Sequence, residues 1–358
     1  MNTRARGAQA VINQQHLKHN LSTFKSLHKG PLIAVVKADA YGHGLTHVVP
    51  ALIGVDAFAV ATIDEAIQLR SLCADKRIIL LEGVFNDVEL QLALQHDFDV
   101  VVHQNYQLTM IKGLKSNQAL RIWLKVDTGM NRLGFDLENA KKVINELKPY
   151  AHIKLHLMSH FAQSDEPLAL QTQQQIRCNE WLASQGLPFS FSNTGAVLSG
   201  ISSENEWVRV GIGLFGISPL PDSQGLDFEL KPVMNLCSKV IATKSIKKGQ
   251  AVGYGAHFVA RTDMRLGMVG IGYADGYPWS KSKDLTVVLA DQSCRIVGRV
   301  SMDMLAIDLS DTPDVVPGAD VQLWGDLMPV ESVAEILDVI PYALVCGITN
   351  RVKFNVIQ

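Results

Sequence analysis

Apolar and polar positions alternate in blocks along the first 230 residues. Short apolar runs that fit buried strands recur about eight times, at residues 33–36, 57–61, 78–81, 99–102, 122–126, 153–158, 189–191 and 207–210. Helical spacing is found at 17–27, which closes at Gly30, and at 64–72, 88–95, 138–147 and 171–184. A short strand is expected near 8–12, and a helix after the first apolar run to about Gly54.

This alternation is typical of repeated βα units, which form either a TIM barrel or a doubly wound open sheet. Polar or charged residues follow nearly every predicted strand. Such a ring of groups suits the mouth of a closed barrel, so we favour an α/β TIM barrel over residues 1–230.

The pattern changes after about residue 230. Short strand candidates separated by Gly and Asp turns are found at 233–244, 265–271, 286–289, 295–300 and 304–309, and only 332–338 has a clear helical pattern. This predicts a second, mainly β domain over residues 231–358.

Composition narrows the class of protein further. The 358 residues are 47% hydrophobic and 19% charged, with a net charge of -2, so neither nucleic acid nor an anionic membrane is an expected partner. The first ten residues carry two arginines but no apolar core, and no apolar run approaches the ~20 residues of a membrane span. A cytoplasmic protein is therefore expected. The five scattered cysteines, without a C-x-x-C pair, predict neither a disulfide framework nor a metal site.

Residues 33–44, IAVVKADAYGHG, carry the first candidate chemistry. A buried run ends at Lys37, and Asp39, Gly42 and Gly44 break it into a loop. Active sites are built at the carboxyl ends of parallel strands, where a lysine amine can act as nucleophile or base. A single strand-end lysine more often only extends its ammonium into water. Tyr41 and the Gly-His-Gly that follows place a phenol and a flexible backbone one short loop away.

Four later segments also place polar groups after predicted strands. They are K125-VDTGMN-R132-LG, SH160-FAQS-D165, NT194-GA and R209-V-G211-I212-G. A guanidinium suits a bidentate grip on a carboxylate, and a hydroxyl with exposed N–H groups beside glycine suits an anion. Taken singly, each segment also has a purely structural interpretation. Arg132 could be a surface arginine, His160 a buried structural histidine, and the glycine-containing segments ordinary turns.

Together these segments resemble the bacterial alanine racemases, a family that binds pyridoxal 5'-phosphate. The resemblance spans nearly the whole chain, with about six segments in the same order. It includes three segments of the tail, VGY254-GA, GY273-ADG and GRVSM302-D303.

The resemblance implies a role for each matched residue. Lys37 would hold the cofactor covalently; Tyr41, Thr194, Gly211 and Ile212 would bind its phosphate; Arg209 would face the pyridine nitrogen and His160 would lie beside the ring. Arg132 and the Met302 amide would bind the substrate carboxylate, and Lys125, carbamylated in many members, would support Arg132. Asp165 and Tyr273 match residues of the substrate corridor, and Asp303 completes the Met302 segment.

The implied reaction is racemisation of alanine by two bases. Lys37 would handle the D-face proton and Tyr254, supplied by the partner of a homodimer, the L-face proton. The product, D-alanine, would serve peptidoglycan synthesis. A permanently charged arginine at Arg209 disfavours protonation of the ring nitrogen, which favours reprotonation over transamination. The resemblance also allows the first ~12 residues to pair with the β domain.

Three alternatives remain open at this point. Asn350 and Trp279 stand where some relatives have a gate tyrosine and an entrance arginine, which mildly favours a broad-specificity racemase for lysine, arginine or serine. A decarboxylase of similar architecture would need an acidic residue in place of Arg209. A cofactor-binding homeostasis protein would tend to lack the β domain.

Overall fold

The computed structural model describes residues 6–114, 118–279 and 284–358. Residues 1–5, part of the amino-terminal segment that the resemblance allows to pair with the β domain, lie outside this range. The chain forms two compact units. The barrel unit comprises Lys18–Leu214 with Ser218–Ser223. The tail unit comprises Phe215–Ile217 and Gln224–Gln358, together with the amino-terminal segment up to Leu17.

The barrel unit is built on eight parallel strands in sequential order. They are β2 (Leu32–Val35), β3 (Ala57–Val60), β4 (Arg77–Leu80), β5 (Phe98–Val102), β6 (Leu120–Lys125), β7 (Ile153–Met158), β8 (Phe189–Ser190) and β9 (Val208–Val210). Strand β2 pairs with both β3 and β9. The ring closes where Trp207 N donates to Phe189 O (2.8 Å) and Arg209 N to Ser192 O (2.9 Å). The predicted TIM barrel is thereby confirmed.

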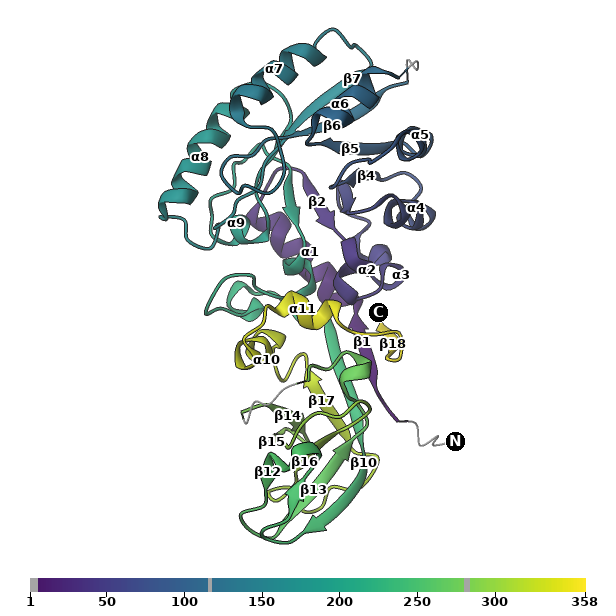
Figure 1. Ribbon diagram of the computed structural model, residues 1–358, viewed down its shortest axis with the longest axis vertical. Coiled ribbons are helices and arrows are strands. Elements are labelled where there is room, and N and C mark those ends of the chain that lie inside the picture. The colour runs from purple at the N-terminus through teal and green to yellow at the C-terminus, as the bar shows by residue number, and fades with distance from the viewer. Residues whose placement is uncertain (1–5, 115–117, 280–283) are drawn as a thin grey trace. The chain divides into compact units, whose positions relative to one another are not determined.

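Helices lie outside these strands (Figure 1). They are α1 (Gln14–Leu27), α3 (Leu45–Val48), α4 (Ile63–Leu72), α5 (Asp87–Gln95), α6 (Asn105–Lys112), α7 (Leu137–Leu147), α8 (Leu170–Ala183) and α9 (Thr194–Leu198). Side-chain caps fix several of their starts, because Thr62, Asn86 and Asp136 each accept a hydrogen bond from a backbone N–H three residues on. Helices α6 and α9 were not predicted, being too short for a clear apolar period.

The connection after β2 differs from the predicted continuous helix. Helix α2 (Lys37–Gly42) has left-handed backbone angles at four successive residues, Ala38 to Tyr41, with φ between 50° and 55°. Gly42 and Gly44 also have positive φ, 73° and 83°. The chain then forms α3 and the 3-10 turn η1 (Val49–Leu52). A left-handed turn of non-glycine residues costs about 1–2 kcal/mol per residue. The spacing of apolar residues does not predict such a turn.

The tail unit contains a second closed sheet. Strand β10 (Met234–Ile246) pairs with β13 (Met264–Val269) and with β17 (Asp320–Trp324). Strands β16 (Leu305–Asp308), β15 (Gln292–Val297) and β14 (Thr286–Leu289) complete the circuit from β13 to β17. Strand β1 (Gln9–Asn13) joins this sheet between β10 and β18 (Lys353–Ile357). The mainly β class of this region is confirmed.

The tail also has elements that the apolar pattern did not predict. Strands β17 and β18 were missed, as were helix α11 (Pro341–Cys346) and the short pair β11 (Ala251–Val252) and β12 (Phe258–Val259). Helix α10 (Val330–Leu337) matches the predicted one to within two residues. Within the described ranges, no helix has the length and apolar character needed to cross a bilayer.

Candidate active site

Lys37 lies where β2 ends, at the carboxyl-terminal mouth of the barrel. Its side chain is exposed, whereas the four residues of β2 before it are buried. The following backbone is anchored by the first turn of α4, because Glu65 accepts hydrogen bonds from Ala38 N (2.7 Å) and Ala61 N (2.8 Å). The amine is thus held on a strained, well-anchored turn at the position expected of a catalytic group.

The same left-handed turn points the Tyr41 side chain into the barrel, where it is buried. Its hydroxyl lies against Gly211, so closely that a Cβ at Gly211 would overlap it. The Gly211 N–H donates to the Thr194 hydroxyl (3.1 Å) at the start of α9. Ile212, fully buried, follows in the turn η2 (Ile212–Phe215). The four residues predicted to bind phosphate therefore form one small cradle of hydroxyl and amide groups.

Arg209 lies on β9 and is buried. Its Nη1 donates to the Ser190 carbonyl (2.8 Å) and hydroxyl (2.5 Å), and its Nη2 to the Ser159 carbonyl (2.7 Å). Burial lowers the pKa of Arg209 to about 10, although the nearby Glu206 opposes this shift. The guanidinium therefore keeps its charge at neutral pH, in a fixed orientation across the ends of β7, β8 and β9.

The Arg209 guanidinium also sets the state of His160. Arg209 Nη2 lies 2.8 Å from His160 Nδ1. Since an arginine only donates, Nδ1 accepts, which places the ring proton on Nε2. Burial and then the positive charge of Arg209 hold the pKa of His160 well below its usual range. His160 is a neutral donor at neutral pH.

Lys125 and Arg132 share a small depression with His160 at the ends of β6 and β7. Burial lowers the pKa of Lys125 well below its usual value, and the charges of Arg209, Arg132 and Lys37 lower it further, against Asp127. The amine of Lys125 is consequently biased toward its neutral form. Three other cations act on it, so this end of the barrel is strongly electropositive.

These residues fit pyridoxal phosphate. The cradle of Tyr41, Thr194 and Gly211 presents two hydroxyl groups beside a glycine where an added Cβ would intrude, which suits a phosphate. The exposed amine of Lys37 suits the aldehyde, and the cationic surroundings suit an anionic cofactor and a carboxylate. Asp165, half-buried, lies farther out in the loop between β7 and α8.

The remaining predicted residues belong to the tail unit. Tyr254 is at the tip of the β11–β12 hairpin, between Gly253 and Gly255, both of which have positive φ. Val252 and Phe258 pack the hairpin onto a core cluster from β10, β13, β15 and β16. The Tyr254 side chain itself is 72% exposed. The hairpin is therefore anchored by its own unit while its phenol projects into solvent.

Met302, Asp303 and Tyr273 come together on two adjoining loops of the tail unit. Ala274 N donates to Met302 O (3.0 Å) and Tyr273 N to Ser301 O (3.1 Å). The side chains of Tyr273 and Met302 are nevertheless exposed. Trp279 is also exposed, with the Arg299 guanidinium 5.3 Å from its ring centroid.

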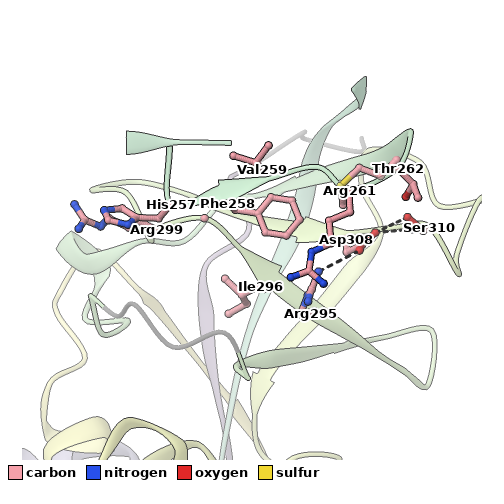
Figure 2. Close-up of a pocket in the computed structure, with 12 residues that line it drawn as sticks. His257, Phe258, Val259, Arg261, Thr262, Arg295, Ile296, Arg299, Asp308 and Ser310 are labelled. Carbon is pink, nitrogen blue, oxygen red and sulfur yellow. Dashed lines mark hydrogen bonds and ion pairs between the residues drawn. The ribbon is translucent and has the colours of Figure 1, made fainter. Parts of the chain in front are cut away.

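A groove of about 590 Å³ lies beside the Tyr254 hairpin. Figure 2 shows His257 and Arg299 at one end and the Arg295–Asp308 ion pair at the other, with Phe258 between them. None of the predicted site residues lines it. We therefore do not include it in the candidate active site.

Several residues that hold the site in place were not predicted from the sequence. Glu65, which anchors the Lys37 turn, was visible only as the fourth residue of a Thr-x-x-Glu capping box. Ser190, which holds Arg209, carries no sequence signal of its own. In the tail, Arg6 and Arg351 each bind both Asp275 and Asp303.

Comparison with known proteins gives concordant matches over almost the whole chain. A family model described as "Alanine racemase, N-terminal domain" matches residues 12–219, and one described as "Alanine racemase, C-terminal domain" matches residues 233–356. The alanine racemase of Aromatoleum aromaticum is 41% identical over 354 residues, 98% of this chain and 99% of that protein. The alanine racemase of Pseudomonas fluorescens is 41% identical over 347 residues, 96% of this chain and 97% of that protein.

Solved structures agree with these matches. The biosynthetic alanine racemase from Pseudomonas aeruginosa has a TM-score of 0.95 and 37% identity, covering 99% of this chain and 100% of that one. The alanine racemase from Bartonella henselae, solved with covalently bound pyridoxal phosphate, has a TM-score of 0.90 and 29% identity, covering 98% and 99%. The family prediction is confirmed: this chain belongs to the alanine racemase family.

Proposed function

We propose that this protein is a pyridoxal-phosphate-dependent alanine racemase that interconverts L-alanine and D-alanine. The observation that carries the proposal is the contact of the buried Arg209 with His160, at the barrel mouth that also bears Lys37. A carboxylate in place of Arg209 would favour protonation of the cofactor ring, as decarboxylation and transamination require. A guanidinium opposes it and favours simple return of the α-proton.

The residues of the barrel unit would bind and orient cofactor and substrate. Lys37 would hold the cofactor covalently, and Tyr41, Thr194, Gly211 and Ile212 its phosphate. The bound cofactor supplies one thing: conjugation of the α-carbon with its ring, which makes the α-proton acidic. Arg132 and the Met302 N–H would fix the substrate carboxylate, which leaves the α-hydrogen as the group that can move.

Racemisation then needs one base on each face of the α-carbon. The Lys37 amine, when not bound to the cofactor, would exchange the proton on the D face. The Tyr254 phenol would exchange it on the L face, with Asp165, Tyr273 and Asp303 shaping the approach to the site.

The second base would come from a partner subunit. Tyr254 and Met302 are 72% and 52% exposed at the surface of the tail unit. Large apolar side chains are also exposed in the loops and first helical turns after barrel strands: Phe85, Val88, Tyr106, Leu133, Leu168 and Leu170. Exposed apolar groups around a mouth mark an interaction surface. They support a homodimer in which each tail completes the other subunit's site.

Lys125 would carry a carbamate in the active enzyme. Its depressed pKa favours the neutral amine that reacts with carbon dioxide, and the negative carbamate would offset the charges of Arg209 and Arg132. The proposed product, D-alanine, would supply peptidoglycan synthesis in a bacterial cytoplasm, an expectation that rests on the family resemblance.

A broad-specificity racemase is the second candidate. Trp279 is exposed and stacked with Arg299, and Asn350 is exposed, where some relatives carry an arginine and a tyrosine. A corridor changed at these two positions favours acceptance of side chains larger than methyl.

Chiral analysis of amino acids tests both candidates. The protein, supplied with pyridoxal phosphate, is incubated separately with L-alanine, L-serine and L-lysine. Fast conversion of alanine alone supports the first candidate, and comparable conversion of lysine the second. No D-isomer from a cofactor-loaded protein would refute both.

The Lys37→Ala variant tests the cofactor assignment separately. It should lose the absorbance of covalently bound cofactor because no other amine is proposed for that bond. Retained absorbance would overturn the assignment.

A further inference from the structure

One carboxylate of the tail unit is fully buried at the centre of an ion-pair network. Asp275 ends the turn η5 (Tyr273–Asp275) and has no exposed side-chain surface. Its oxygens accept hydrogen bonds from Arg6 Nη1 (3.1 Å), Arg6 Nη2 (2.5 Å) and the Gly272 N–H (2.8 Å). Arg351 Nε lies 3.3 Å away. A carboxylate that is removed from water requires such a set of partners.

The two arginines also bind Asp303, which closes a ring of alternating charges. Arg351 Nη2 donates to Asp303 Oδ1 (2.6 Å), and Arg6 Nη2 to the Asp303 carbonyl (2.6 Å). The hydrogen bond from Arg351 lowers the pKa of Asp303. The ring therefore joins four segments that are far apart in sequence: the amino-terminal arm, the Asp275 turn, the Met302–Asp303 loop and the loop before β18.

Backbone contacts reinforce the ring. The turn of Asp275 donates from Tyr273 N to Ser301 O and from Ala274 N to Met302 O, as described above. Gly272 packs so tightly on this loop that a Cβ would overlap the carbonyls of Ser301 and Met302. On the other side, Thr349 N donates to Asp275 O (3.2 Å).

Met302 is held by these contacts but keeps its donor available. Its carbonyl accepts from Ala274, whereas no acceptor in the part of the chain that the structure describes takes a hydrogen bond from its N–H. The loop is therefore fixed from behind, with one amide free on a segment whose side chain is exposed.

We propose that Asp275 is a positioning residue, which holds the Met302 amide in place for the substrate carboxylate through its ring with Arg6, Arg351 and Asp303. This rests on the proposed function, because it assumes that the Met302 N–H binds the carboxylate. Binding groups act only when held within about 0.5 Å of their productive position. Burial of a carboxylate is energetically costly, so packing alone does not explain Asp275. Its charge fixes the geometry of two guanidinium groups at once, which explains its position.

The Asp275→Asn variant tests the proposal in the cofactor-loaded enzyme. The amide retains an acceptor for the Gly272 N–H but removes the charge that both arginines bind. We expect KM for alanine to rise about tenfold, with a smaller fall in kcat, because displacement of a binding group by a fraction of an ångström weakens the productive complex. The inhibition constant of propionate, a carboxylate without an amine, should rise in parallel.

Asp320→Asn is the matched control. Asp320 forms an ion pair with Lys239 (2.6 Å) in the same unit and binds none of the four ring residues, so its substitution should leave KM and the propionate constant unchanged. Arg351 is partly exposed, and Arg351→Gln should raise KM and the propionate constant as Asp275→Asn does. Arg351→Lys, which keeps the positive charge, should raise them less. If Asp275→Asn does not fold, this arginine pair carries the test.

The proposal is overturned if folded Asp275→Asn, or Arg351→Gln in its place, shows a lower melting temperature but wild-type KM and propionate inhibition. That result would make the ring purely structural. Failure of the proposed function looks different, since the wild-type protein would then not racemise alanine at all.

Discussion

His43, within the Gly-His-Gly that follows Tyr41, has no exposed surface. Its Nδ1 lies 2.9 Å from the Tyr41 carbonyl. Burial lowers the pKa of His43 to about 4, against about 6.5 in an unfolded chain. Between these values the native state binds fewer protons than the unfolded state, so the free energy of unfolding decreases as the pH falls.

We therefore expect the protein to lose stability between pH 6.5 and about 4. A pKa difference of about 2.5 corresponds to about 3 kcal/mol for His43 alone. In denaturant unfolding, the free energy of unfolding of His43→Asn should fall less than that of the wild type over this pH range. His257→Asn, at an exposed imidazole of the tail, is the control. Equal slopes for His43→Asn and the wild type would contradict the assignment.

Gly211 is the residue-scale test of the phosphate cradle. In Gly211→Ala the new Cβ would displace the Tyr41 hydroxyl and disturb the Thr194 contact. We expect the dissociation constant of pyridoxal phosphate to rise about tenfold or more, as loss of about 1.4 kcal/mol implies. Absorbance titration of the apoprotein measures it. Gly54→Ala, whose Cβ would meet only ordinary contacts, should titrate like the wild type; the same curve for Gly211→Ala would show that the phosphate binds elsewhere.

At the scale of the element, the left-handed turn Ala38–Tyr41 has a backbone conformation that lowers stability but positions functional groups. Asp39 Oδ1 accepts from Leu45 N (2.7 Å) and Glu65 from Ala38 N, so surrounding groups hold a conformation that these residues disfavour. The strain is local and lies between the amine of Lys37 and the phenol of Tyr41. It is the arrangement expected where backbone geometry is needed to aim functional groups.

Ala38→Gly tests this view. Glycine adopts positive φ without the Cβ penalty, so the free energy of unfolding should rise by about 0.5–1 kcal/mol after the added chain entropy is subtracted. Ala183→Gly, at the end of α8, should not raise it, because there glycine replaces alanine in an ordinary right-handed conformation. Thermal unfolding compares the two. A loss of stability in Ala38→Gly would mean that the turn is not strained.

The extent to which sequence predicted these elements follows from the same physics. Strands β2, β3 and β5 are buried along their whole length, so each left an apolar run bounded by polar residues, and such runs gave the βα order. The left-handed turn left no such trace, because Ala-Asp-Ala is also acceptable in an ordinary helix. Strands β17 and β18 were missed because their sequences, DVQLW and KFNVI, are short and follow segments without an apolar pattern.

The site was predicted by resemblance more than by pattern. Singly, Lys37, Arg132 and His160 had common structural alternatives, and only their order along the chain selected a function. Asp275 shows the limit. Its partners Arg6 and Arg351 are more than 70 positions away in either direction, so no local spacing could connect them.

At the scale of the whole molecule, the two proposed bases lie in different units. Lys37 belongs to the barrel unit and Tyr254 to the tail unit, where its phenol is exposed at a hairpin tip. If the site is completed between subunits, as proposed, each site of a dimer takes Lys37 from one chain and Tyr254 from the other. Two inactive variants with defects in different bases should then complement each other.

We expect mixed Lys37→Ala and Tyr254→Phe proteins to regain about a quarter of wild-type activity after unfolding and refolding together. Random pairing makes half of the dimers mixed, and in each mixed dimer one site receives both intact bases while the other receives neither. Each variant refolded alone should be almost inactive. As control, Lys37→Ala mixed with the double variant should stay inactive, because no pairing then gives a complete site. Absence of activity in the mixed sample, with mixed dimers verified by mass spectrometry, would place both bases of a site in the same chain.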